Sequence, residues 1–507
     1  MSPAPKKSTC SPSPEDFAKK FNAGKPQLIW HWTSSDLETP VSAYLKLCGH
    51  KPYSFLLESV EGGVTLGRYS IIGTNPDLLW RCKKKQVATK KDNGQWKNNQ
   101  SPALTALKTA IKDSVIDDIP HDLPPMCAFG LFGYVGYDMV RLIEDIPDNN
   151  PDPLNLPDSM LMRPGLLAIF DNVKNRICLA APVYDHAKNC KDSEEKIYAR
   201  ACNKIHESLK ILSAPLDQKQ LAHETKLNTP LDISSNTTEE QYKGMVKKAV
   251  DYIHAGEIFQ VVPSQRFSVF FDLPAFELYR ALRSVNPSPF LFHLSFEDFA
   301  LVGSSPEILV RVRDGDITIR PIAGTRKRGK TAEEDLALAQ DLLDDPKECA
   351  EHLMLLDLGR NDVGRVAEIG SVKVTDRFII EYYSHVMHIV SNIVGKLRSD
   401  FDIVDALFAG FPAGTVSGAP KIRAMEIIDE LEINRRSFYA GAVGYFSGQA
   451  LDSCIALRTA LVKDGKVYIQ AGAGIVADSN SDAEYQETCN KARALVNAAE
   501  TAIDNFS

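Results

Sequence analysis

The 507-residue sequence has no apolar run of 18 or more residues, so it predicts no membrane-spanning helix. Its ten cysteines have neither zinc-site spacing nor the pattern of a disulfide framework, which is typical of reduced thiols in a cytoplasmic protein. Positive charge is not in excess either. The net charge of −8 argues against nucleic acid as a main partner. What remains is the composition of a soluble globular protein, with 44% hydrophobic residues.

The domain organisation follows from shifts in composition. Residues 1–14 are rich in Ser, Pro and Lys without the apolar core of a signal peptide, so we expect a disordered lead-in. An N-terminal regulatory or structural domain is expected over residues 15–212, and a second, catalytic domain over residues 240–507. The Ser-, Thr-, Asn- and Pro-rich stretch 213–239 reads as a linker between them. The sequence also leaves open that the two parts share a continuous sheet.

Two pairs of glutamates mark the C-terminal third of the chain. Glu348 and Glu351 are three residues apart, as are Glu484 and Glu487, so in a helix each pair leaves one face. If the two faces meet, four carboxylates surround one point, which favours a hard cation such as Mg²⁺. Either pair alone is equally compatible with an ordinary solvated helix surface.

Small-residue stretches at 411–421 and 470–475 lie between the two pairs. Their backbone N–H groups can approach an anion closely, and Lys421 adds a positive charge. A divalent cation beside anion-binding turns indicates a small substrate that carries more than one carboxylate or phosphate.

Read together, these stretches resemble the chorismate-binding enzymes, and most closely the large subunits of anthranilate synthases. The resemblance is dense from about residue 242 to residue 497. It includes the motifs GSSPE at 303–307, PIAGTR at 321–326, HIVS at 388–391, YAGAVGY at 439–445 and IALRT at 455–459. It implies an α+β fold with two large, mostly antiparallel β-sheets packed together, helices outside, and the active site in the cleft between the sheets.

Two positions favour one branch of this family. In relatives that add water to chorismate, the residue that matches Gln260 is a lysine, which activates the water. Glutamine cannot act as a general base. Aminodeoxychorismate synthases commonly have a lysine nucleophile at the position matching Ala323. The resemblance therefore implies conversion of chorismate and ammonia to anthranilate and pyruvate, the first step of tryptophan biosynthesis. The alternatives are an aminodeoxychorismate synthase and a catalytically silent tryptophan-sensing protein.

The resemblance also implies residue roles. Glu351 and Glu487 would bind Mg²⁺ directly with Glu348 and Glu484 nearby, and the ion would hold the ring carboxylate of chorismate. Glu307 would protonate the departing 4-hydroxyl. The other catalytic residues implied are His388, for the loss of pyruvate, Thr415 and Lys421. The substrate-binding residues implied are Gln260, Ala323, Thr325, Ala471, Gly472 and Gly474, together with Tyr439 and Arg458 for the pyruvyl carboxylate.

A feedback site for L-tryptophan is implied by LES at 57–59 and NPSPFLF at 286–292. The residues concerned are Leu57, Glu58, Ser59, Asn286, Pro287, Ser288, Phe290 and Leu291. Many relatives have Tyr-Met at the last two positions, which leaves the strength of inhibition open. The plain alternative is a strand and a proline turn without a ligand.

The ammonia is expected to come from glutamine through a separate subunit. Glutamine hydrolysis by this route needs a nucleophilic cysteine in a Gly-x-Cys-x-Gly turn, and none of the ten cysteines has glycine two residues before it. The sequence therefore predicts a glutamine amidotransferase partner and a hetero-oligomer.

Overall fold

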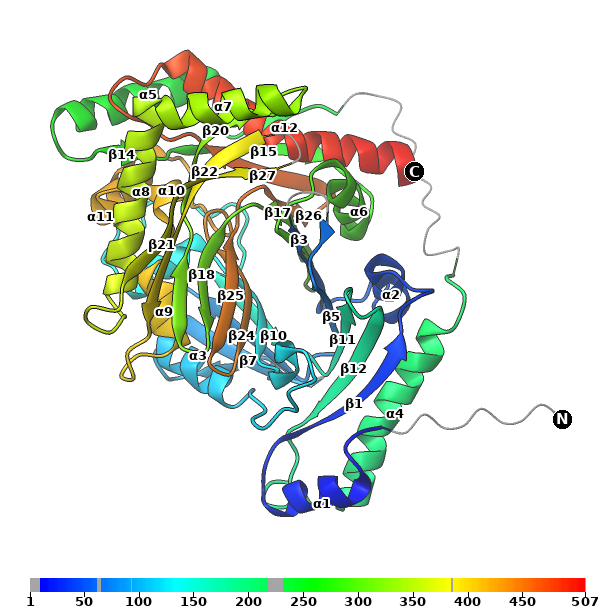
Figure 1. The fold of residues 1–507 in the computed structure, drawn as a ribbon. Helices are drawn as coiled ribbons and strands as arrows, with labels where there is room; N and C mark the ends of the chain where they lie inside the picture. The colour runs from blue at the N-terminus through cyan, green and yellow to red at the C-terminus, as the bar shows by residue number, and fades with distance from the viewer. Residues whose placement is uncertain (1–9, 62–64, 93, 218–230, 384–385, 507) are drawn as a thin grey trace.

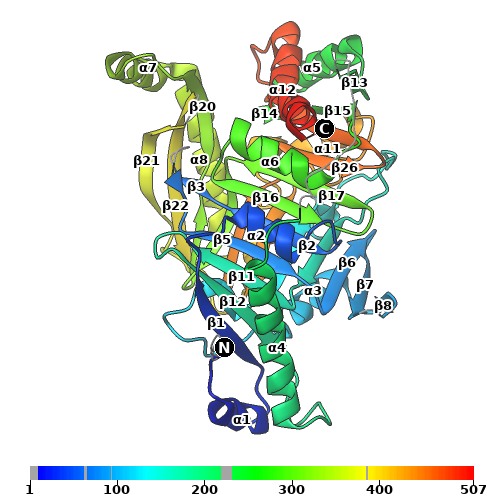
Figure 2. The same ribbon diagram turned by 90° about the vertical axis from the view of Figure 1, so that its right-hand side faces the viewer.

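The structure, a computed structural model, describes residues 10–61, 65–92, 94–217, 231–383 and 386–506 (Figures 1 and 2). Two large β-sheets pack face to face, with helices on their outer surfaces. Every strand pairing in the described ranges is antiparallel, and the predicted α+β architecture is confirmed. Most of the expected lead-in and residues 218–230 of the expected linker lie outside the described residues.

The first sheet has 11 strands in the order β1-β12-β11-β5-β2-β16-β17-β26-β27-β15-β13. Its N-terminal and C-terminal strands meet at the β2·β16 pair, in which Leu291 lies opposite Glu58. The strands are β1 (Gln27–Ser34), β2 (Ser54–Glu58), β5 (Tyr69–Thr74), β11 (Leu166–Asp171), β12 (Arg176–Val183), β13 (Ser234–Ser235), β15 (Ser264–Phe270), β16 (Phe290–Ser295), β17 (Phe299–Ser305), β26 (Thr459–Lys463) and β27 (Lys466–Gly472).

The second sheet has 12 strands in the order β20-β22-β19-β18-β25-β24-β9-β10-β6-β7-β8, with β21 paired to β22. Its two parts meet where Ala442 of β24 lies opposite Val135 of β9. The strands are β6 (Leu78–Lys83), β7 (Gln86–Lys91), β8 (Lys97–Asn99), β9 (Leu131–Val135), β10 (Ser159–Arg163), β18 (Ile308–Arg313), β19 (Asp316–Ile319), β20 (Ile322–Lys327), β21 (Lys373–Tyr382), β22 (Val386–Lys396), β24 (Ala442–Ser447) and β25 (Ala450–Ile455). Strands from both sides of residues 213–239 thus contribute to both sheets.

Two short ladders complete the β-structure of the described residues: β3 (Val60–Glu61) with β4 (Thr65–Leu66), and β14 (Gln260–Val261) with β23 (Gly418–Ala419).

The helices lie outside the sheets (Figure 1). α4 packs on β1 and β12, α6 packs on β17, α12 packs on β27, and α8 packs on β20 and β22. None of the helices in the described ranges is both long and apolar enough to cross a membrane. Their bounds are α1 (Pro14–Asn22), α2 (Pro40–Leu47), α3 (Ala103–Lys112), α4 (Glu194–Leu212), α5 (Glu239–His254), α6 (Ala275–Val285), α7 (Ala332–Asp344), α8 (Pro346–Gly364), α9 (Ile403–Ala409), α10 (Gly414–Ser417), α11 (Lys421–Leu431) and α12 (Ser481–Phe506), with 3₁₀ turns at Pro125–Ala128 and Tyr137–Leu142.

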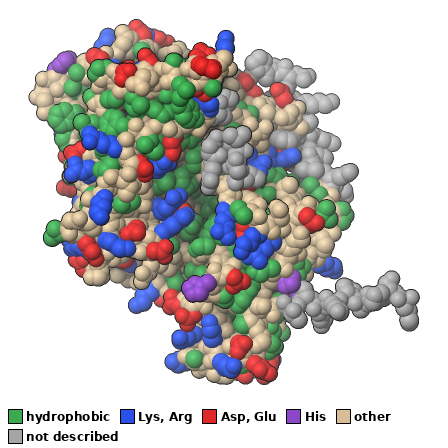
Figure 3. Space-filling model, in the orientation of Figure 1, with side chains coloured by type: hydrophobic (Ala, Val, Ile, Leu, Met, Phe, Trp, Pro, Cys, Tyr) green, Lys and Arg blue, Asp and Glu red, His purple; other side chains and the backbone are tan. Residues whose placement is uncertain are grey.

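Aromatic rings from the two sheets interlock in the core. Phe55 of β2 stacks on Phe132 of β9 with 4.7 Å between ring centroids, and Phe132 stacks in turn on Tyr445 of β24 at 5.3 Å. Gly73 makes room for the Phe55 ring, because a Cβ there would lie 2.2 Å from it. The two sheets are therefore held in one continuous core. On the outer surface, charges of both signs are interspersed around a hollow lined by hydrophobic side chains (Figure 3).

Candidate active site

Gln260 lies where three separate parts of the chain meet. It belongs to β14 and pairs with Ala419 of β23. Its Nε2 donates a hydrogen bond to Oε1 of Glu351 on α8, at 2.9 Å. A Cβ built on Gly474 would lie 2.8 Å from the same Nε2. A side chain at position 474 would displace Gln260, so glycine is required for this close approach.

The two predicted glutamate pairs lie on α8 and α12. Lys347 stands near both: its pKa is raised first by an ion pair with Asp478 (3.0 Å) and then by the charges of Glu484 and Glu351. The two pairs therefore face a common region. Within the described ranges, however, no group of three His, Cys, Asp or Glu side chains is close enough to hold a metal ion.

Each of these carboxylates contacts a donor. Burial and the charge of Glu351 raise the pKa of Glu348, and burial and Glu487 raise that of Glu484, so negative charge is incompletely compensated here. Carboxylate oxygens are the ligands that Mg²⁺ prefers, so these residue types suit a hard divalent cation, but the four described carboxylates do not converge on one point. The donors are Arg326 for Glu348 (3.4 Å), Gln260 for Glu351, Ser479 for Glu484 (2.8 Å) and Lys491 for Glu487 (2.7 Å).

Glu307 lies between β17 and β18 with 6% of its surface exposed. Burial raises its pKa from 4.5 to about 8. Thr415 of α10 lies 3.3 Å from both carboxylate oxygens and donates to them. A carboxyl group that holds its proton at neutral pH can act as a general acid.

His388 of β22 is oriented by the neighbouring strand β20. Its Nδ1 lies 2.9 Å from the carbonyl oxygen of Gly324 and 3.1 Å from Oγ1 of Thr325. Because a carbonyl only accepts, Nδ1 carries the proton and Nε2 is left as an acceptor. Burial, and then the charge of Arg458, lower the pKa of His388, which favours a neutral ring able to take up a proton. Ala323 lies one step along β20, opposite Ile389.

Arg458 and Tyr439 provide groups that can bind an anion. Arg458 has a backbone φ of +46°, and burial lowers the pKa of its guanidinium. In the described part of the chain no carboxylate forms an ion pair with it. The buried Tyr439 hydroxyl lies beside Gly472 of β27, the residue after Ala471: a Cβ built on Gly472 would lie 3.1 Å from it. A buried guanidinium without a carboxylate partner is suited to binding a carboxylate.

Lys421 is already paired. Its Nζ lies 2.8 and 2.9 Å from the two carboxylate oxygens of Asp362 on α8, and both side chains are largely buried. Its predicted role in countering substrate charge stays a prediction.

Known proteins match this chain over nearly its whole length. The family model of the chorismate-binding enzymes matches residues 52–497. The chain belongs to this family. It is 53% identical to anthranilate synthase component 1 of Cereibacter sphaeroides, over 96% of this chain and 97% of that protein. The corresponding protein of Pseudomonas aeruginosa is 48% identical over 93% and 94% of the two chains.

Solved structures agree with this family membership. Anthranilate synthase component I of Streptococcus pneumoniae is similar with a TM-score of 0.73 and 38% identity, covering 92% of this chain and 99% of that one. The menaquinone-specific isochorismate synthase MenF of Escherichia coli has a TM-score of 0.68 at 19% identity over 94% and 95% of the chains, a likeness of fold alone.

The residues predicted for an inhibitor come together in this chorismate-binding enzyme. Leu57 and Glu58 of β2 lie beside Phe290 and Leu291 of β16, and the carbonyl of Asn286 just before β16 accepts from the Ser304 hydroxyl. Ser59, Pro287 and Ser288 lie at the ends of the same two segments. Two stretches from distant parts of the sequence thus lie side by side on adjacent strands. Whether it binds tryptophan stays a prediction.

Sequence reasoning missed the partners of Glu58. Arg283 donates to it at 2.8 Å and Tyr279 donates from one turn earlier in α6. The i,i+4 spacing of these two residues on an amphipathic helix was the available signal.

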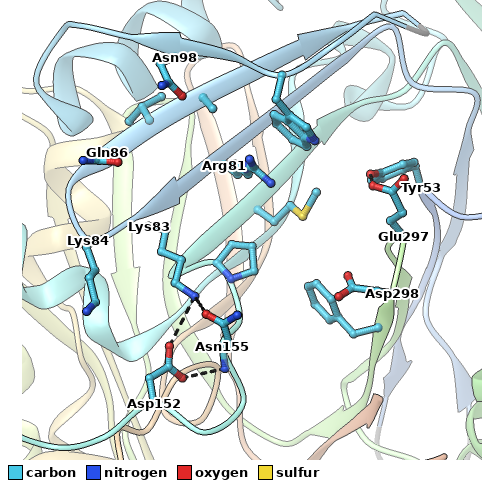
Figure 4. Close-up of a pocket in the computed structure, with 16 residues that line it drawn as sticks. Tyr53, Arg81, Lys83, Lys84, Gln86, Asn98, Asp152, Asn155, Glu297 and Asp298 are labelled. Carbon is cyan, nitrogen blue, oxygen red and sulfur yellow. Dashed lines mark hydrogen bonds and ion pairs between the residues drawn. The ribbon is translucent and has the colours of Figure 1, made fainter. Parts of the chain in front are cut away.

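A cavity of about 810 Å³ lies apart from these residues (Figure 4). Two of its polar pairs lie within its own walls: the Tyr53 hydroxyl donates to Glu297 at 2.6 Å, and Lys83 pairs with Asp152 at 3.6 Å. None of the predicted site residues is among the described residues that line it. The cavity has no evident part in the predicted chemistry.

Proposed function

We propose that this chain converts chorismate and ammonia to anthranilate and pyruvate, the first step of tryptophan biosynthesis. The observation that carries the choice within the family is Gln260, whose amide contacts Glu351 at 2.9 Å. An amide at this position cannot deprotonate water, which favours a nucleophile such as ammonia that needs no base. The relatives named anthranilate synthase component 1, similar over nearly the whole chain, support the same choice.

The substrate would be oriented by its two carboxylates. Arg458 and Tyr439 bind the pyruvyl carboxylate, with the backbone of Gly472 beside Tyr439. Glu351 and Glu487 would hold Mg²⁺, with Glu348 and Glu484 nearby, and the ion would supply positive charge for the ring carboxylate. The choice of these four glutamates as ligands is a proposal that rests on their carboxylate chemistry.

Two of the chain's own groups would move protons. Glu307 gives its proton to the 4-hydroxyl, which leaves as water while ammonia adds to the ring, and the ammonium group so formed returns a proton to the Glu307 carboxylate. Nε2 of His388 then accepts the ring proton as the bond from the ring to the enolpyruvyl oxygen breaks, and it passes this proton to the methylene carbon of the departing group, which becomes pyruvate. The raised pKa of Glu307 and the lowered pKa of His388 fit an acid and a base respectively.

The ammonia is proposed to come from a separate glutamine amidotransferase subunit, consistent with relatives named as component 1. L-Tryptophan is the proposed inhibitor, bound where β2 meets β16. Glu58 there is a buried carboxylate held by Arg283, a polar group that suits an amino acid ligand.

The test is a fluorescence assay of the purified chain with chorismate and ammonium, with Mg²⁺ or with EDTA, and with or without L-tryptophan. Anthranilate that forms only with Mg²⁺ is the expected product, and tryptophan should suppress it. Aminodeoxychorismate as the product would show that Ala323 does not distinguish the branches. No turnover by the folded protein would favour the catalytically silent sensor.

A further inference from the structure

A buried ion pair outside the proposed chemistry lies at the centre of the binding segments. Arg436, 2% exposed, follows α11 and pairs with Glu432, 4% exposed, four residues earlier in the chain. Nε of Arg436 lies 3.1 Å from both carboxylate oxygens, and Nη2 lies 2.7 Å from Oε1. This bidentate geometry fixes the plane of the guanidinium.

The remaining donors of Arg436 reach two backbone carbonyls. Nη1 donates to the carbonyl oxygen of Val416 at 2.7 Å, and Nη2 donates to that of Val262. Val416 directly follows Thr415, and Val262 lies two residues after Gln260. One side chain therefore ties together the segment that donates to Glu307 and the segment that contacts Glu351.

Glu432 extends the connection to β15 and β27. Its Oε1 accepts from both the N–H and the hydroxyl of Ser264, at 2.8 and 2.7 Å. Ser264 lies opposite Gly472 and accepts from the Gln470 amide at 2.8 Å. The strand that carries Ala471 and Gly472 is thus bonded to the same pair.

The segment that carries Tyr439 is the fourth one in contact with the Arg436–Glu432 pair. Its ring centroid lies 5.4 Å from the guanidinium carbon of Arg436, three residues earlier in the chain. A guanidinium near an aromatic ring is attracted to its face.

We propose that Arg436, held by Glu432, is a positioning residue that sets the relative geometry of the four segments that bind chorismate. This inference rests on the proposed function. Arginine offers five donors in a rigid plane, whereas a lysine has one ammonium group and cannot bond Glu432, Val416 and Val262 in this geometry. A buried ion pair is a poor source of stability compared with apolar packing, so its use here fits a role in positioning.

The test compares Arg436→Lys with Arg163→Lys. Arg163 is also buried, bonded to both oxygens of Asp77 (2.7 and 2.8 Å), and lies in β10 away from the binding segments. We expect Arg436→Lys to raise the KM for chorismate about 10- to 100-fold, measured well below the unfolding midpoint of each variant. Arg163→Lys should lose stability and keep its KM within about twofold. An unchanged KM in a folded Arg436→Lys protein overturns the proposal.

A double-mutant cycle separates positioning from general destabilisation. If Arg436 acts through Tyr439, the effects of Arg436→Lys and Tyr439→Phe on kcat/KM are less than additive in the double variant, whereas strictly additive effects contradict the proposal. Should Arg436→Lys not fold, Ser264→Ala removes only the hydroxyl between Glu432 and Gln470. It should raise KM about threefold or more, and an unchanged KM counts against the proposal. If the unaltered chain itself shows no activity with chorismate and ammonium, the proposed function is refuted instead.

Discussion

The protonation of Glu307 leads to a prediction that joins stability to catalysis. Its carboxyl group has a pKa of about 8 in the folded chain and 4.5 as the ordinary value. Below pH 4.5 both states carry the proton, and the carboxyl group adds no pH dependence. Between these values the unfolded chain releases the proton and the folded chain keeps it, so stability falls as pH rises. Above about pH 8 the whole penalty is present.

The size of this effect follows from the shift. One pH unit corresponds to about 1.4 kcal/mol, so a shift from 4.5 to about 8 amounts to about 5 kcal/mol at high pH. Glu307→Gln keeps the shape of the side chain without its charge. The variant should differ from the original by less than about 1 kcal/mol at pH 5 and be more stable at pH 9, with the difference growing through the interval between them.

The assay is urea unfolding of both proteins from pH 5 to pH 9, together with initial rates. As a control, Glu333→Gln at the exposed start of α7 should show the pH dependence of the original chain. The rate of the unaltered enzyme should fall as pH rises past about 8, and Glu307→Gln should lose about 10²- to 10⁴-fold in kcat. A stability difference that does not change with pH would show that Glu307 ionises normally and would refute its assignment as the acid.

Three further perturbations address other parts of the site. Arg458→Lys removes bidentate contact with a carboxylate and should raise the KM for chorismate about 10- to 100-fold, with an unchanged KM contradicting the assignment. Glu58→Gln weakens the hold on Arg283 and should shift the tryptophan inhibition curve to higher concentration while the uninhibited rate is kept; an identical curve would place the inhibitor elsewhere. Lys421→Met leaves Asp362 buried without its cation and should cost about 3 to 5 kcal/mol in urea unfolding, so an unchanged midpoint would mean that solvent reaches Asp362.

Local patterns predicted individual elements well. The i,i+3 spacing of the two glutamate pairs fits the helices α8 and α12 on which they lie, and the alternation of strands and helices fits the predicted α+β class. The architecture of two packed sheets came from the family resemblance, because periodicity shows strands without showing which strands pair.

What could not be predicted depends on contacts between distant segments. The pKa of Glu307 is set by burial beneath Thr415, and the neutralisation of Lys421 depends on Asp362 of another helix. The bonds from Arg436 run to backbone carbonyls, which leave no mark in the side-chain sequence. Such contacts exist only once the chain has folded, and one sequence without related sequences to compare gives no trace of them.

The interleaving of the sheets constrains how this chain can acquire its structure. In the first sheet β2 pairs with β16, and in the second sheet β9 pairs with β24. One edge of β2 and one edge of β9 therefore stay unpaired until these later strands are available. A chain cut at residues 213–239 would leave each fragment with open strand edges prone to aggregation. Completion of both sheets therefore has to wait until the late segments are made, and we expect the two fragments to regain the full sheets only when mixed. Pairings over such long sequence separations also make for slow folding.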